Sequence, residues 1–279
     1  ASSELQAETG IEVLQVDYSN TEELTRVLEG NKIEIVISTL FVAFDGSPQV
    51  NLVNAAEASQ YTKRFIPSIW GIPYSRAEVG ETNMVIGKSK LDAVEALEKT
   101  SLEYTLFYVG YFLDFWGYPH VKSYQRQNII AVDIEYKRAA IPGTGNTPVT
   151  FTHTLDIAEY VAASLDLPKW ELESYVIGDV VTWNEFLSIA EETIGEKFEV
   201  SFDDLTTLRQ GRITELPSHL SLYSQMPKDE IQALFATFGV WFEAGLYHLR
   251  PTTKTLNEIF PHIKTRTVKE VITAGWTRE

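Results

Sequence analysis

Apolar runs rich in β-branched residues alternate with helix-like segments over the first 110 residues, and this alternation is the strongest constraint on the fold. Strands are expected at residues 11–16, 33–40, 64–67 and 104–109. Helices are expected between them, at residues 21–28, 48–59 and 88–100. Because these strands are apolar almost throughout, they are typical of a parallel sheet that is covered on both faces. The sequence therefore predicts an α/β fold with a doubly wound parallel sheet.

The regular alternation weakens after Tyr111. Residues 156–165 and 183–194 are predicted helices, the second one capped by Thr182, and the chain from residue 205 onward has a mainly helical pattern. We expect residues 1–110 to form a dinucleotide-binding core. Residues 111–279 are expected to form mainly a smaller substrate-binding lobe, with some segments returning to the core.

Composition and charge exclude several classes of function. The 279 residues carry 39 acidic and 23 basic side chains, and the resulting net charge of −16 argues against nucleic-acid binding because it repels phosphate backbones. The longest apolar run, residues 33–44, is too short to span a membrane, and the first residues do not form a signal peptide. The chain has no cysteine, which excludes disulfides and thiol nucleophiles and fits the cytoplasm. No spacing of histidines and carboxylates indicates a metal site.

The order of the first elements is typical of the middle of a nucleotide-binding sheet. The strand at residues 11–16 leads into Asp17, and Ser19 or Asn20 then begins a helix. In dinucleotide-binding sheets a central strand, a glycine-rich turn and a helix come before such a unit. We therefore expect a further strand, helix and strand, on the order of 35 to 45 residues, ahead of Ala1. The close glycine pair Gly143 and Gly145 leads into a strand instead of a helix, and so predicts a hairpin turn.

The carboxyl ends of the predicted strands are where a doubly wound sheet binds its ligand. We expect the adenosine half of a dinucleotide to lie beside Asp17 and the segment 38–41. The expected cofactor-binding residues at the strand ends are Asp17, Tyr18, Ser38, Thr39, Leu40, Phe41, Pro67, Ser68, Tyr108 and Gly110.

Aromatic residues gather around the end of the last predicted strand, at Tyr108, Tyr111, Phe112, Phe115, Trp116 and Tyr118. So dense a cluster indicates the wall of a cleft for a flat, apolar substrate, with core packing as the alternative. Two histidines, His120 and His153, lie toward the same side and can relay a proton near neutral pH, or they are structural. The expected substrate-binding residues are Trp70, Tyr111, Phe112, Phe115, Trp116, His120 and His153.

Three segments together resemble one family of reductases. They are KRFIPSIWG (63–71), GKSKLDAVEALEKTSLEYTLFYVGYF (87–112) and IPGTGNTPVTFTHTLDIAEYVAASL (141–165). The chain resembles the NmrA-like branch of the atypical short-chain dehydrogenases, which includes the isoflavone, pinoresinol-lariciresinol and phenylcoumaran benzylic ether reductases, and within it the fungal secondary-metabolism members. The resemblance implies a Rossmann-type fold, NADP(H) as cofactor, and a substrate cleft between the carboxyl edge of the sheet and a C-terminal lobe. The family's Gly-x-x-Gly-x-x-Gly motif has no counterpart in this sequence.

The same resemblance implies that Lys90 is the catalytic lysine and binds the cofactor as well. An ammonium there can bond the ribose hydroxyls of the nicotinamide half and support proton transfer. The alternative is a solvated helix lysine, for which the nearby Lys88 serves as a comparison. The spacing Tyr118-x-x-x-Lys122 matches the usual short-chain dehydrogenase pair, but Pro119 places it outside a regular helix, which favours a chance match.

One departure from the family makes the expected pocket more apolar. Ile69 stands where relatives often carry an acidic residue, and Trp70 stands in place of a phenylalanine. The sequence predicts an NADPH-dependent reductase of an aromatic or polycyclic small molecule, in secondary metabolism. The alternatives are a redox-silent NADP(H)-binding regulator of the NmrA type, or a family member that acts as a cyclase or isomerase. The expected partner is a small-molecule substrate, without nucleic acid or membrane, for a monomer or homodimer.

Overall fold

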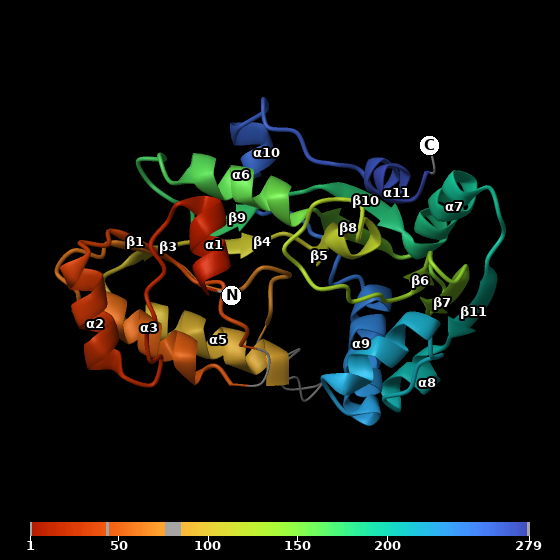
Figure 1. The fold of residues 1–279 in the computed structure, drawn as a ribbon, viewed down its shortest axis with the longest axis horizontal. Coiled ribbons are helices and arrows are strands. Elements are labelled where there is room, and N and C mark those ends of the chain that lie inside the picture. The colour runs from red at the N-terminus through yellow and green to blue at the C-terminus, as the bar shows by residue number, and fades with distance from the viewer. Residues whose placement is uncertain (1, 43–44, 76–84, 278–279) are drawn as a thin grey trace. The chain divides into compact units, whose positions relative to one another are not determined.

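The computed structural model describes residues 2–42, 45–75 and 85–277 of the chain (Figure 1). It divides into two compact units. Unit 1 consists of Ala1–Ile69 and Tyr74–Leu106, and unit 2 consists of Trp70–Pro73 and Phe107–Glu279. The main division lies between Leu106 and Phe107, and the expected boundary at residue 110 and the roles of the two parts stay predictions.

Unit 1 contains a parallel three-stranded sheet in the order β1-β2-β3. The strands are β1 (Ile35–Ile37), β2 (Arg64–Ile66) and β3 (Glu103–Tyr104), and the helices are α1 (Ser2–Thr9), α2 (Thr21–Gly30), α3 (Ser47–Ala58) and α5 (Val85–Leu97). Phe65 is the register partner of Val36 on one side and of Tyr104 on the other. The predicted helices at residues 21–28, 48–59 and 88–100 are confirmed, with ends shifted by a few residues.

The core of unit 1 forms where the helices pack on this sheet. α2 packs against α3, and α3 packs against α5. The apolar residues of α2 recur at helical spacing, so Leu24 and Leu28 lie on one buried face, and Asn20 caps the helix by accepting a hydrogen bond from the Glu23 amide. The buried residues of this core are Leu24, Leu28, Val36, Leu52, Val53, Ala55, Ala56, Phe65, Leu97 and Leu102.

The strand predicted at residues 11–16 is wrong. This segment has no regular secondary structure, and its side chains at Ile11, Val13 and Leu14 are exposed. A strand exists only when a neighbour supplies its hydrogen bonds, and β1 pairs with β2 alone in the described sheet. Only the end of the segment, at Val16, and the following Tyr18 pack on the core of unit 1.

Unit 2 combines three small sheets with helices. Its strands are β4 (Leu106–Tyr108, beginning at the unit boundary), β5 (Tyr111–Phe112), β6 (Val132–Asp133), β7 (Arg138–Pro142), β8 (Pro148–Thr152), β9 (Glu173–Tyr175), β10 (Asp179–Thr182) and β11 (Glu199–Asp203). They are ordered β10-β8-β5, β11-β7-β6 and β4-β9. Its helices are η1 (Leu113–Trp116), α6 (Thr154–Ser164), α7 (Trp183–Ile194), α8 (Leu205–Arg209), η2 (Pro217–Ser224), α9 (Lys228–Glu243), α10 (Leu256–Ile259) and α11 (Val268–Trp276).

The glycine turn between β7 and β8 is not the predicted hairpin. Gly143 and Gly145 have φ values of 60° and 70°, as the prediction of a tight turn requires. However, β7 pairs with β6 and β11, whereas β8 pairs with β5 and β10. The turn therefore carries the chain from one sheet to another, and the Asn184 amide at the start of α7 donates to the Gly145 carbonyl at 3.1 Å.

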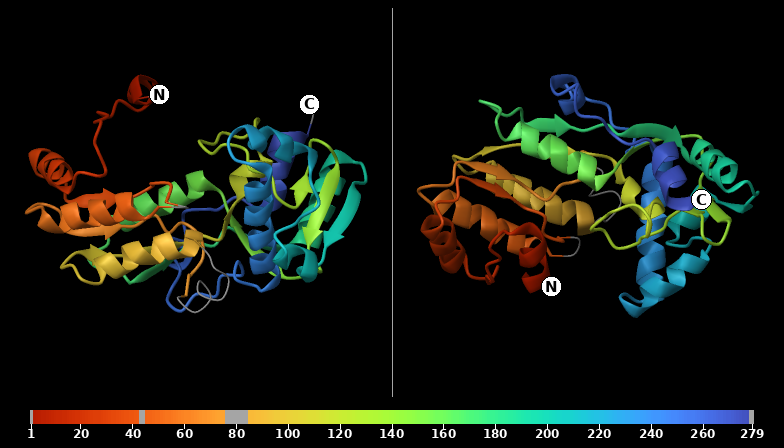
Figure 2. Two further views of the ribbon diagram at one scale, coloured as in Figure 1. Left: turned by 90° about the horizontal axis from the view of Figure 1, so that it is seen from below. Right: turned by 45° about the horizontal axis from the view of Figure 1, so that its top comes forward.

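The helices of unit 2 are placed by caps and by aromatic packing. Thr182 caps α7 as predicted, in a reciprocal capping box with Glu185. α9 packs against α8 and lies beside β7 (Figure 2). The aromatic core of the unit consists of Tyr111, Trp116, Phe151, Trp183, Phe186, Phe242 and Tyr247.

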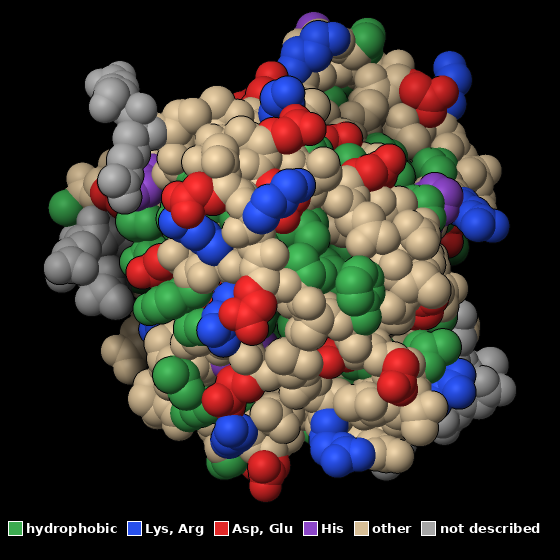
Figure 3. Space-filling model, turned by 90° about the vertical axis from the view of Figure 1, so that its right-hand side faces the viewer, with side chains coloured by type: hydrophobic (Ala, Val, Ile, Leu, Met, Phe, Trp, Pro, Cys, Tyr) green, Lys and Arg blue, Asp and Glu red, His purple; other side chains and the backbone are tan. Residues whose placement is uncertain are grey.

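The net charge does not form a patch of one sign on the face that carries α7 and β11. Figure 3 shows acidic, basic and apolar side chains interleaved there. Ion pairs on this part of the chain include Lys137 with Glu196 at 2.6 Å and Arg138 with Glu199 at 2.9 Å. Among residues 2–42, 45–75 and 85–277, no helix is long and apolar enough to cross a membrane.

Two glycines with similar positive φ values differ in how much space a side chain would have, so substituting each one distinguishes backbone strain from steric overlap. Gly110 and Gly195 have φ values of 73° and 74°, but a Cβ on Gly110 would lie 2.2 Å from the Thr150 carbonyl oxygen, whereas nothing lies within 4 Å of one on Gly195. Gly195→Ala should lower the free energy of unfolding by about 1–2 kcal/mol through backbone strain. Gly110→Ala should cost about 1–3 kcal/mol more through overpacking. Urea denaturation of both variants measures the difference, and equal losses would contradict the crowding at Gly110.

Candidate functional site

The candidate site is the carboxyl end of β2 in unit 1. There the Ser68 amide donates to the Gln49 Oε1 atom at 2.6 Å, and the Ser68 hydroxyl donates to the Leu40 carbonyl at 2.9 Å. The Ser38 amide donates to the Ile66 carbonyl at 2.8 Å, which continues the pairing of β1 and β2. The strand-end segments 38–41 and 67–69, both predicted as site segments, therefore meet at the first turn of α3.

Gln49 was not predicted from the sequence. It is completely buried, and its Nε2 atom has no hydrogen-bond partner among the described residues. The sequence spacing could have indicated that Gln49 is buried, because residues 49, 52, 53 and 56 recur at the spacing of one helical face. A polar side chain on an apolar helix face must serve a hydrogen bond, and here it serves the end of β2.

Lys90 and Lys88 lie on the same helix in different surroundings. The Lys90 Nζ atom donates to the Ile69 carbonyl and lies 5.1 Å from the centre of the Tyr74 ring. Burial lowers the pKa of Lys90 to about 8. The Lys88 side chain is 70% exposed and forms an ion pair with Asp92 at 2.8 Å. Since two residues turn a helix by about 200°, the two ammonium groups point to nearly opposite sides.

The residues expected around the adenosine half differ in exposure. Asp17 does not end a strand: its carboxylate accepts hydrogen bonds from the amide and hydroxyl of Ser19, and these bonds lower its pKa. Tyr18 is tied to α3, because the Asn51 side chain donates to its carbonyl at 2.9 Å. Thr39 is exposed, and Phe41 is 84% exposed.

Other predicted residues of this set lie deeper in the chain. In unit 1, Pro67 and Ser68 are buried. In unit 2, the Trp70 ring packs 5.3 Å from that of Phe107, and Trp70 has a φ of 29°, a strained value for a non-glycine residue. Tyr108 is buried against the ring of Tyr175. The Gly110 amide donates to the Gly71 carbonyl at 3.0 Å.

The aromatic cluster expected to wall a cleft is mostly core. Tyr111, Phe115 and Trp116 are buried, and the Trp116 indole donates to the Val132 carbonyl at 2.8 Å. The Tyr111 ring contacts the ring of Phe151 in β8, of Phe242 in α9 and of Tyr247 after α9. Within the predicted set, Phe112 is partly exposed and remains available to a substrate.

The two predicted histidines have different surroundings. His153 is completely buried, and its Nδ1 atom caps α6 by accepting a hydrogen bond from the Leu155 amide at 3.2 Å. Burial also lowers its pKa, so it is a neutral cap, which corrects the expectation of a substrate-side proton relay. His120 is exposed, with its ring against Trp276.

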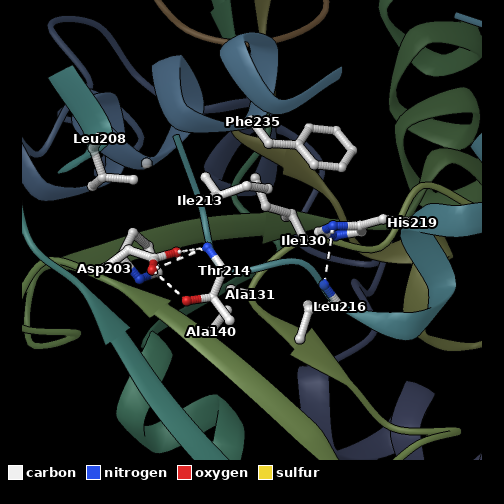
Figure 4. A pocket seen from close by; sticks show the side chains of 12 residues that line it. Ile130, Ala131, Ala140, Asp203, Leu208, Ile213, Thr214, Leu216, His219 and Phe235 are labelled. Atoms are coloured by element: carbon white, nitrogen blue, oxygen red, sulfur yellow. Dashed lines mark hydrogen bonds between the residues drawn. The ribbon is translucent and has the colours of Figure 1, made fainter. Parts of the chain in front are cut away.

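Unit 2 contains a small cavity of about 20 Å³ between β7, η2 and α9 (Figure 4). Of the polar groups in its lining, the His219 Nε2 atom is buried without a hydrogen-bond partner among the described residues, and the others have partners. Asp203 accepts from the amide and hydroxyl of Thr214, and the His219 Nδ1 atom accepts from the Leu216 amide at 3.2 Å. Burial lowers the pKa of His219 to about 4. The other lining side chains shown in Figure 4 are apolar, so the cavity offers no free charge to a ligand.

Lys90 places an ammonium donor at the end of β2, and the Gln49 amide beside this strand end is completely buried. Hydroxyl and carboxamide groups are the acceptors that such donors require. A second hollow, lined by the first turns of α3 and α5, suits a pyrophosphate poorly, because Asp45 and Asp92 outnumber Lys88 there. Within the described parts of the chain, no three histidine or carboxylate side chains are grouped to hold a metal ion.

Comparison with known proteins identifies the family. The sequence profile of the NmrA-like family matches residues 1–271. The chain is 35% identical to "Oxidoreductase BOA1" of Botryotinia fuckeliana over 94% of this chain and 84% of that protein. The chain therefore belongs to the NmrA-like family, and the predicted family and oxidoreductase class are confirmed.

Solved structures confirm the fold. The binary complex of leucoanthocyanidin reductase with NADPH from Vitis vinifera superposes with a TM-score of 0.72 at 17% identity, covering 97% of this chain and 87% of that one. A protein solved with NADP+ and (+)pinoresinol gives a TM-score of 0.71 at 17% identity, over 96% and 82%. The predicted Rossmann-type α/β fold is thus shown.

Gln49→Met should destabilise the protein although it keeps the volume of the side chain. The buried Ser68 amide would lose its acceptor, which costs about 1–3 kcal/mol of the free energy of unfolding. Gln60→Met is the matched control, because Gln60 is exposed and bonds only through its backbone. Chemical denaturation of the two variants measures the effect. Equal stability of Gln49→Met and the wild type would show that this bond does not hold the strand end.

The buried His219 predicts a specific dependence of stability on pH. Since its pKa is about 4 when folded, against 6.5 for an ordinary histidine, the unfolded chain binds a proton in this window and the folded protein does not. Its contribution to stability therefore falls as the pH falls from 6.5 toward 4, by roughly 3 kcal/mol in total.

His219→Asn keeps an acceptor for the Leu216 amide and removes this proton linkage. The unfolding free energy of the wild type should approach that of the variant as the pH is lowered. His262→Asn, at an exposed histidine, is measured in parallel as the control. A difference between the wild type and His219→Asn that does not change with pH would refute the neutral buried imidazole.

Proposed function

We propose that this member of the NmrA-like family is an NADPH-dependent reductase of an aromatic or polycyclic small molecule, in secondary metabolism. The observation that carries the proposal is the Lys90 amine, held on the Ile69 carbonyl at the end of β2 with a pKa lowered to about 8. A group whose pKa lies near the operating pH is suited to proton transfer. The cytoplasm, and a monomer or homodimer, belong to the same proposal.

The names of the relatives support the cofactor and the substrate class. The Vitis vinifera reductase was solved with NADPH, and the other structure holds NADP+ with pinoresinol, an aromatic compound. In unit 1, the exposed Phe41 offers apolar surface for such molecules. Stacking on aromatic side chains would then orient a flat substrate.

Each residue at the end of β2 has a defined task in this proposal. When bound, the cofactor supplies the hydride. Lys90 would bond the ribose hydroxyls of the nicotinamide half and exchange a proton with the substrate at its Nζ atom. Gln49 and Ser68 keep the strand-end backbone in place, so that the Ile69 carbonyl presents Lys90 in a fixed position. The apolar side chain of Ile69 is buried and adds no carboxylate beside the amine.

Lys90→Met should lower NADPH-dependent turnover by about 10²–10⁴-fold, because it removes the proton-transfer group and keeps the aliphatic stem. Lys88→Met is the matched control on the same helix and should stay within a few-fold of the wild type. NADPH oxidation with a panel of lignans, flavonoids and quinones measures turnover, and circular dichroism checks folding.

Three outcomes would contradict the proposal in different ways. Equal turnover by Lys90→Met and the wild type would remove Lys90 from the mechanism. Tight NADPH binding without oxidation by any compound of the panel would favour the redox-silent regulator, and conversion of a substrate without net NADPH oxidation would favour a cyclase or isomerase.

A further inference from the structure

Tyr74 covers the amine of Lys90. The Lys90 Nζ atom lies 5.1 Å from the centre of the Tyr74 ring, within the range of a cation–π contact. Its hydrogen-bond acceptor, the Ile69 carbonyl, comes from the same loop that carries Tyr74. Both side chains are partly buried, and all three residues belong to unit 1. The loop after β2 therefore holds the amine by two contacts of different kinds.

No charged partner explains the position of Lys90 among the described residues. Its contacts there are the Ile69 carbonyl and the Tyr74 ring. On its own helix, Lys88 and Asp92 pair with each other, and they line the hollow that also contains Asp45 of the segment before α3. At the strand end itself, α3 contributes Gln49 and the segment after β2 contributes Ser68, and both are neutral.

The Tyr74 side chain is uncharged when it contacts the Lys90 amine. Burial raises the pKa of the Tyr74 phenol well above its ordinary value, so the ring is neutral throughout the physiological range. Its effects on the amine are then two. The ring face attracts the ammonium form by about 0.5–2 kcal/mol, and the bulk of the ring excludes water, which penalises the same form.

We propose that Tyr74 is a positioning residue for Lys90, whose ring fixes the amine on the Ile69 carbonyl and keeps water away from it. The proposal rests on the proposed function only in treating Lys90 as the group that meets the cofactor. Tyr74 itself touches no reacting atom; it acts through the amine. Because exclusion of water outweighs the ring's attraction, the covered amine is more easily deprotonated than an ordinary lysine.

The test measures the titration of the amine itself, without cofactor or substrate. The intact protein is acetylated in short pulses with acetic anhydride across a pH series, and the Lys90 and Lys88 peptides are quantified by mass spectrometry. The midpoint of each pH curve reports the pKa of that amine and does not depend on its accessibility. In the wild type the Lys90 midpoint should lie near 8.

Three variants separate the two effects of the ring. Tyr74→Phe keeps both and should leave the Lys90 midpoint unchanged. Tyr74→Ala admits water and should raise the midpoint by about one unit or more toward that of an ordinary lysine. Tyr74→Leu keeps an apolar cover without a ring face and should lower the midpoint by about half a unit. Lys88 should not change in any of them.

An unchanged Lys90 midpoint in Tyr74→Ala overturns the proposal, and if that variant does not fold, an unchanged midpoint in Tyr74→Leu overturns it instead. The pH profile of kcat/KM then links the result to catalysis, because it should move with the acetylation midpoint. A midpoint that moves while turnover is unaffected upholds the role of Tyr74 and refutes only the function proposed for Lys90.

Discussion

The hydrogen bond from the Ser68 amide to the Gln49 side chain is the interaction on which the candidate site depends. It joins the first turn of α3 to the end of β2 inside a region without water access. The Ser68 hydroxyl also donates a hydrogen bond to the Leu40 carbonyl and so holds the segment after β1 in place. The next residue, Ile69, supplies the carbonyl that accepts from Lys90. A buried amide without its acceptor costs far more than the bond contributes when made, so this junction is expected to be rigid.

Lys88 and Lys90 show how surroundings decide the chemistry of one residue type. Lys88 extends into solvent and meets a carboxylate one helical turn away, a contact worth little in water. Lys90 faces a carbonyl and an aromatic ring, and no counter-charge among the described residues offsets the loss of water. The two lysines lie close together on one helix, and the burial of Lys90 lowers the pKa of its amine to about 8.

Local features of this fold could be predicted from the sequence, and features that depend on distant partners could not. Helices α2, α3 and α7 follow from periodicity and caps that lie within each segment. The segment 11–16 has the composition of a strand but lacks a neighbour to pair with. Tyr111 and Trp116 are aromatic whether they line a cleft or fill a core, and only the contacts with β8 and α9 decide between the two. The resemblance to the reductase family predicted Lys90 as a site residue. Its acceptor, the Ile69 carbonyl, and the Tyr74 ring beside it depend on the three-dimensional structure.

The composition of the two cores has a consequence for the order of folding during synthesis. The core of unit 1 draws on residues from Leu24 to Leu102, so all of it is synthesised before Tyr111. The aromatic core of unit 2 closes around Tyr111 only when Phe242 and Tyr247 arrive. Contacts between such distant positions form slowly, because a long loop must close before they are gained. At translation speeds of about 5–20 residues per second, several seconds or more pass between the synthesis of Tyr111 and that of Tyr247. During this interval the aromatic side chains near Tyr111 lack their packing partners, and the nascent chain is most prone to aggregation.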